Sequence, residues 1–111
     1  MTGARPARME PEMHETHAMR EVNVCVDGLD LPFDLAGSLA RQLAWHVARQ
    51  AGGEAMPLAW FDRKAGRECP VVPECMHKPG WLAYARGHGG DLSIVVNEGE
   101  YVFVFCVVKG L

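Results

Sequence analysis

Two apolar segments separated by a short polar turn lie near the C-terminus. Residues 91–96 and 101–108 are rich in Val, Ile, Phe and Tyr, the residues that favour β-strands. The polar turn between them contains Gly99, which supplies the positive φ that tight turns require. The pattern predicts an antiparallel hairpin in which Val96 pairs with Tyr101.

The second of these segments, residues 101–108, has apolar side chains on both faces of the predicted strand. Odd-numbered residues line one face and even-numbered residues line the other. A strand of this kind lies in the middle of a sheet, or is covered on its second side by another chain. We therefore expect a central strand, with Val102, Val104 and Val108 as a candidate surface for self-association or a partner.

Four further patterns precede the hairpin. Strict alternation over residues 21–27 predicts a half-buried strand, and residues 55–61 predict a second strand. Between them, an apolar stripe predicts a helix that begins at the N-cap Asp34 and ends at Gly52. A proline in the first turn predicts a short helix over residues 79–86.

The apolar stripe of the long helix follows an i, i+4 spacing. It consists of Leu35, Leu39, Leu43 and Val47, flanked by Ala36 and Ala40. On a helical wheel, His46 falls inside this stripe, so we expect either a core imidazole with a hydrogen-bond partner or a residue in a cleft. Trp45 falls on the polar side, where it can cover a loop or face a partner.

The order β-α-β-α-β-β predicts an α+β fold, a two-layer sandwich with helices on one face of a mixed four-stranded sheet. A chain of 111 residues is expected to form one domain, here residues 21–111 after a flexible N-terminal tail over residues 1–20.

The net charge of −3 provides no basic stripe for nucleic acid. No apolar run approaches the ~20 residues of a membrane span, and no signal peptide is evident, so we expect a cytoplasmic protein.

A proline-rich segment in the middle of the chain contains Cys69, Cys75 and His77. Thiolate and imidazole are the preferred ligands of zinc, and a fourth ligand could come from His88 or Cys106. The spacing departs from the usual zinc knuckle, because five residues separate the two cysteines. The same cysteines could instead form a redox pair, provided that their Cα atoms lie within about 7 Å.

Aromatic, acidic and basic side chains near the same segment suggest a small-molecule pocket. They are Trp60, Asp62, Trp81, Tyr84 and His88. A cleft with apolar walls and a few polar groups is the usual form of a binding site. Alternatively, the tryptophans belong to the core and His88 is solvated.

The latter half of the chain resembles a family of small uncharacterised domains from anaerobic bacteria and archaea. The resemblance rests on Met56-Pro-Leu-Ala-Trp-Phe-Asp62, Cys69-Pro70, Cys75, Pro79-Gly-Trp81, Tyr84-Ala85, Gly89-Gly-Asp-Leu92 and Gly99-Glu-Tyr-Val-Phe103. That family has no assigned activity, so the resemblance implies a compact α+β domain and no catalytic residues.

Two functions remain open from the sequence. The first is a non-enzymatic binding or interaction module, with an unknown small molecule, a protein or a second copy of the chain as its partner. The second is a small enzyme, or a metal or thiol redox protein, that uses the segment from Cys69 to His77 and His88. The first predicts a mass that depends on concentration, and the second predicts bound metal or one cysteine that alkylates fast.

Overall fold

The structure is a computed structural model that describes residues 19–73 and 78–110. Its elements are β1 (Arg20–Val24), α1 (Phe33–Gln50), β2 (Gly53–Asp62), β3 (Arg67–Cys69), α2 (Gly80–Gly87), β4 (Leu92–Val96), the 3-10 turn η2 (Asn97–Gly99) and β5 (Tyr101–Lys109). Within the described residues, the strands form one sheet in the order β1-β4-β5-β2-β3. β1 runs parallel to β4, and all other neighbours are antiparallel, so the predicted mixed α+β sheet is confirmed.

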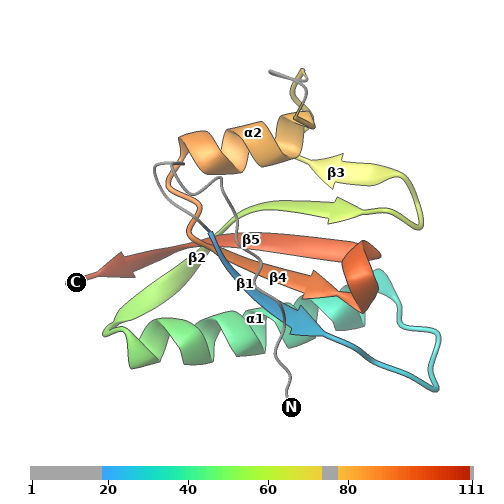
Figure 1. The fold of residues 1–111 in the computed structure, drawn as a ribbon, viewed down its shortest axis with the longest axis horizontal. Helices are drawn as coiled ribbons and strands as arrows, with labels where there is room; N and C mark the ends of the chain where they lie inside the picture. Colours follow the sequence, from blue (N-terminus) through green and yellow to red (C-terminus); the bar gives the residue numbers. More distant parts are fainter. Residues whose placement is uncertain (1–18, 74–77, 111) are drawn as a thin grey trace, which may run out of the picture.

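The two helices lie on opposite faces of the sheet (Figure 1). On the α1 face, the core contains Tyr101, Phe103 and Phe105, whereas Val104 of the same strand packs with Trp81 of α2 on the other face. The prediction of helices on one face is therefore wrong. Because central strand β5 is apolar on both sides, each side requires its own cover, and the chain itself supplies both.

The C-terminal hairpin has the predicted register, with Val96 opposite Tyr101. The connection is longer than a two-residue turn, because η2 occupies it. Gly99 has the expected positive φ of 97°, and Asn97 and Glu98 also have positive φ values. The central position of β5 between β4 and β2 is confirmed.

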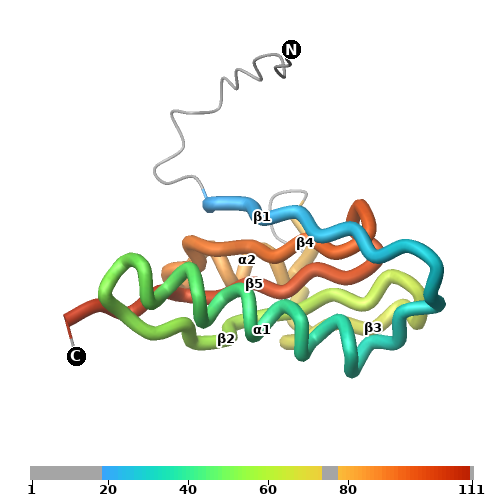
Figure 2. Tube along the Cα trace, turned by 90° about the horizontal axis from the view of Figure 1, so that it is seen from below, coloured from blue at the N-terminus to red at the C-terminus, as the bar shows by residue number. Residues whose placement is uncertain are grey.

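The buried face of helix α1 overlaps the predicted stripe but is centred on its small residues. The predicted flanks Ala36 and Ala40 are fully buried, and Leu39, Leu43 and Val47 are partly buried against the core. The buried residues of the helix are Ala36, Gly37, Ala40, Ala44 and Ala48. Leu35 is 41% exposed and His46 is exposed, so the placement of His46 inside the buried stripe is wrong, whereas Trp45 is 57% exposed as expected. Small side chains allow the helix to approach the large aromatic residues of β5. Figure 2 shows α1 in front of the strands on which it packs.

The helix also begins earlier than predicted. Its first residue is Phe33, and Pro32 occupies the N-cap position without a side-chain hydrogen bond. The expected N-cap Asp34 lies inside the first turn, where a carboxylate favours the positive end of the helix dipole. Pro32 has the extended backbone typical of an N-cap residue, and its carbonyl accepts the hydrogen bond from the backbone N–H of Ala36 at 3.0 Å.

Strand β2 is longer than predicted and contains a β-bulge. Pro57 pairs with Phe105 and Ala59 pairs with Val104, so Leu58 is an extra residue at the bulge. Strand β3 was not predicted because it has only three residues, two of them charged, at the edge of the sheet. It raises the strand count above the predicted four. No helix in the described ranges is long and apolar enough to cross a membrane.

Candidate functional site

A cleft of about 420 Å³ lies between the first half of α1 and the β2·β5 pair. Its walls are apolar and largely aromatic, and they consist of Phe33, Pro57, Ala59, Trp60, Phe103 and Phe105. Its polar lining comes from one helix, α1, and consists of Asp34, Ser38 and Arg41. Apolar walls with a few polar groups on one side are typical of small-molecule sites.

Two local features keep this cleft open. The first is Gly37 of α1, where a methyl group would lie 3.4 Å from Nη1 of Arg41 and 3.5 Å from Cε2 of Phe103. The second is the bulge in β2, which directs Leu58 toward the α2 face while Trp60 packs on the α1 face. As a result, neither a side chain at position 37 nor the side chain of Leu58 occupies the cleft.

The aromatic walls of the cleft pack against one another. The ring centroid of Phe33 lies 4.7 Å from that of Trp60 and 5.6 Å from that of Phe103, with tilted rings in both pairs. Phe103 is buried, whereas Phe33 and Trp60 are half-buried and present part of their surface to the cleft. Offset and tilted aromatic pairs are favourable, so this wall is ordered before a ligand arrives.

A cation lies over the same two rings. The guanidinium of Arg67 is 5.2 Å from the ring centroid of Phe33 and 5.6 Å from that of Trp60. Asp62 holds it there through an ion pair of 3.1 Å, and the carboxylate also accepts a hydrogen bond from the backbone N–H of Ala65. Asp62 is only 3% exposed, so its role is to position Arg67 and the β2–β3 turn.

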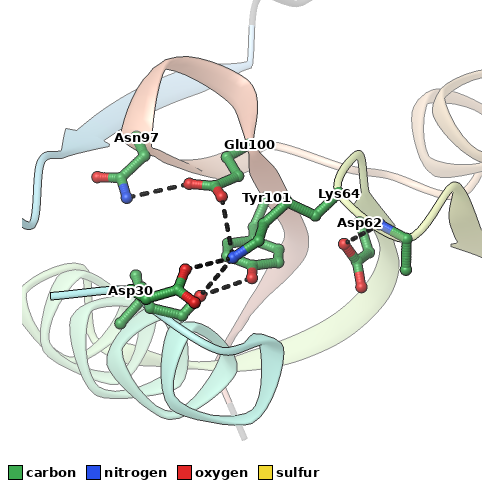
Figure 3. A network of polar contacts seen from close by, with 8 residues as sticks. Asp30, Asp62, Lys64, Asn97, Glu100 and Tyr101 are labelled. Atoms are coloured by element: carbon green, nitrogen blue, oxygen red, sulfur yellow. Dashed lines mark hydrogen bonds and ion pairs between the residues drawn. The ribbon is translucent and has the colours of Figure 1, made fainter.

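A second polar network fixes the loop that leads into α1 (Figure 3). Lys64 forms ion pairs with Asp30 at 2.8 Å and with Glu100 at 3.4 Å. The hydrogen bond between Lys64 and Asp30 raises the pKa of Lys64 and lowers the pKa of Asp30. The hydroxyl of Tyr101 donates to the backbone carbonyl of Leu31 at 2.6 Å. These contacts set the position of the start of α1, and hence of Phe33.

The five residues predicted to form a small-molecule pocket fall into two groups. Trp60 lines the cleft beside α1, and Asp62 is connected to it through Arg67. The remaining three residues belong to α2 or its C-terminal end, on the opposite face of the sheet. The structure therefore does not bring all five residues into one pocket.

On the α2 face, the predicted residues make structural contacts. Trp81 is buried and stacks on Phe61 with a centroid distance of 5.3 Å. His88 is exposed, stacks on Tyr84 at 4.0 Å, and its Nδ1 lies 2.8 Å from the carbonyl oxygen of Tyr84. The stacking of Trp81 and the contact between His88 and Tyr84 stabilise α2 and its C-terminal end.

The predicted metal ligands are only partly visible. Cys69 is an exposed free thiol at the end of β3, whereas Cys75 and His77 lie outside the described residues. Among the described residues, no group of three or more His, Cys, Asp or Glu side chains is arranged to hold a metal. The zinc site and the redox pair both remain predictions.

Four residues of the cleft were not predicted as site residues, namely Phe33, Gly37, Arg41 and Phe103. Phe33 and Phe103 read as ordinary core residues, and nothing in a single sequence places them next to Trp60. Gly37 did leave a signal, because an isolated glycine inside a helical pattern costs stability and often has a packing or functional reason. The glycine at position 37 could therefore have indicated a close approach or a cleft beside the helix.

Comparison with known proteins gives a family and a related fold. A family model described as a domain of unknown function (DUF5619) matches residues 19–105. An uncharacterised protein from Archaeoglobus fulgidus is 36% identical over 64 residues, which cover 58% of this chain and 68% of that protein. The crystal structure of a novel protein from the same organism, AF1514, superposes with a TM-score of 0.66 at 28% identity, covering 84% of this chain and 100% of that chain.

Proposed function

We propose a small-molecule-binding function for this chain, which belongs to the family of the DUF5619 domain of unknown function. The binding site is the cleft between α1 and the β2·β5 pair. The sheet and the two polar networks act as a rigid frame that presents the aromatic wall of this cleft. Of the three partners that the sequence left open, a small molecule, a protein or a second copy of the chain, the cleft favours the small molecule.

The observation that supports the proposal most is the combination of volume and lining. A cleft of about 420 Å³ lies within the range of ligand pockets, about 300 to 1,000 Å³. Its aromatic side chains are packed against one another and covered by Arg67, so little ordering remains to be done on binding. Partial exposure of Phe33 and Trp60 leaves apolar surface that a ligand would remove from water.

The test is a binding screen with bicyclic aromatic compounds, read by the thermal unfolding temperature and confirmed by isothermal titration calorimetry. Gly37→Leu should fill the cleft from the helix side and abolish binding of any compound that the wild type takes. Gly37→Ala keeps the fold and should weaken binding more modestly, because one methyl group fits beside Arg41 and Phe103. Binding that is unchanged in both variants would place the ligand elsewhere and defeat the proposal.

A further inference from the structure

Arg41 is the cation at the edge of the cleft that has no acidic partner. It is exposed on α1, lines the cleft, and its Nη2 lies 3.4 Å from the hydroxyl oxygen of Ser38. Across residues 19–73 and 78–110, it makes no ion pair with Asp or Glu. Arg67 differs in this respect, because Asp62 already neutralises it. Arg41 therefore has hydrogen-bond donors that are free for an anion.

One carboxylate, Asp34, shares the polar lining with Arg41. Its backbone lies about two turns earlier on the same helix, about 10 Å along the axis. The guanidinium of Arg41 reaches back along the helix, because Nη1 lies 3.4 Å from the methyl position at Gly37 and Nη2 lies 3.4 Å from the hydroxyl oxygen of Ser38. Among the described residues, Asp34 and Arg41 form no ion pair, so the guanidinium keeps donors for an anion on the Ser38 side of the cleft.

The apolar part of the cleft lining is mostly aromatic, with Pro57, Ala59 and Val104 beside the rings. Phe33, Trp60 and Phe103 enclose the apolar part, and a planar ring can pack against such tilted faces with favourable geometry. The proline at the bulge, Pro57, adds an apolar surface without a backbone N–H donor. All polar side chains of the lining come from α1, whereas the sheet contributes only apolar ones, and Phe33 extends the aromatic surface onto the helix.

Given the binding function proposed above, we infer that the ligand is a planar aromatic molecule with a carboxylate or similar anionic group. Its ring packs against Phe33 and Trp60, and Arg41 binds the anion. An arginine forms two parallel hydrogen bonds to a carboxylate, which adds direction as well as affinity. The location of Arg41 at one end of the lining sets the orientation of the ring inside the cleft.

The experiment compares two probes that share one ring system and differ in charge, 2-naphthoate and 2-naphthamide. Isothermal titration calorimetry is carried out on the full chain, on Arg41→Gln and on Arg49→Gln. Arg49 is the matched control, because it is exposed on the same helix and lies over Trp45, 5.1 Å from its ring centroid, away from the cleft. The wild type should bind the naphthoate about tenfold more tightly than the amide.

Arg41→Gln should remove this preference, because it should weaken the binding of 2-naphthoate about tenfold more than the binding of 2-naphthamide, whereas Arg49→Gln should keep the preference. Circular dichroism confirms that each variant is folded. If both probes bind equally, or if the preference survives in Arg41→Gln, the assignment of an anionic ligand at Arg41 is overturned while the cleft remains a binding site. If neither probe binds, both the ligand class and the binding function fail.

Discussion

The carboxylate of Asp62 lies 3.1 Å from the guanidinium of Arg67 and is itself buried. Through this pair, a residue at the end of β2 determines which cation covers the rings of Phe33 and Trp60. The pair therefore connects the packing of the β2–β3 turn to the aromatic wall of the cleft. Asp62 thus has a structural role, because it positions Arg67 beside the cleft.

Asp62→Asn should be clearly destabilising. The amide keeps the shape of the side chain but loses the charge that Arg67 pairs with, which should cost about 1 to 3 kcal/mol of unfolding free energy. The control is Asp30→Asn, because Asp30 also pairs with a cation, Lys64, but is exposed. Its effect should be much smaller and should decrease in high salt. Equal losses in the two variants, measured by urea unfolding, would contradict a structural role for the buried pair.

Gly37→Ala should make the protein more stable while it narrows the cleft. A glycine inside a helix costs about 0.5 to 1 kcal/mol relative to alanine, and the new methyl group meets no atom closer than 3.4 Å. The control is Gly52→Ala, because Gly52 has a φ of +78° that alanine adopts unfavourably. This variant should lose about 1 kcal/mol of unfolding free energy. Urea unfolding measures both. A loss of stability in Gly37→Ala would mean that the helix packs more tightly there than the structure shows.

Tyr101→Phe should destabilise the protein by removing the buried hydrogen bond to the carbonyl of Leu31. The expected loss is about 1 to 2 kcal/mol, since Lys64, at 3.5 Å from the same carbonyl, can only partly replace the hydroxyl. Thermal unfolding provides the measurement. Hydrogen exchange should also become faster in the loop before α1, and an unchanged exchange pattern would speak against its anchoring by Tyr101.

Cys106 should be the slowest to alkylate among Cys25, Cys69 and Cys106. Burial raises the pKa of Cys106, with a further contribution from the charge of Asp91, so less reactive thiolate is present at neutral pH. Peptide mapping after iodoacetamide treatment at several pH values measures each rate. The rate at Cys106 should rise at higher pH than the rates at the two exposed thiols, and a Cys106 that reacts as fast as Cys69 would contradict this.

The same shift predicts a dependence of stability on pH. Because the pKa of Cys106 is higher in the folded protein, its contribution is fully present below the pKa of the unfolded thiol, near 9.0, and is lost as pH rises through the folded pKa. Cys106→Ala should therefore flatten the alkaline decline of the unfolding free energy. A decline that is equally steep in this variant would assign it to other groups.

The longer strands and the central position of β5 could be predicted because their apolar patterns reveal the strand period directly, whereas β3 has only three residues and no such pattern. The buried side of α1 could be predicted only in part. Leu39, Leu43 and Val47 of the i, i+4 line do pack against the core, but the fully buried residues are small, because the sheet presents the large side chains of Tyr101, Phe103 and Phe105. The volume available at an interface depends on both partners, and a single helix sequence shows only one of them.

The candidate site was predicted only in part for a related reason. Trp60 was recognised as a pocket residue, but its neighbours Phe33 and Phe103 come from elements distant in the sequence. Trp81, Tyr84 and His88 follow Trp60 along the chain, but they belong to α2 and its C-terminal end, on the other face of the sheet (Figure 1). The resemblance to a family of small uncharacterised domains is confirmed by the family match and by the relatives from Archaeoglobus fulgidus.

The central claim is that the cleft beside α1 binds small aromatic molecules. The most direct measurement is a two-dimensional ¹H–¹⁵N NMR titration with 2-naphthoate, which locates the ligand on the chain. We expect the amides of Gly37 and Arg41 and the indole N–H of Trp60 to shift together, with no change at the indole of Trp81. Shifts that instead cluster around Trp81 and His88, or no shifts at saturating probe, would contradict the claim.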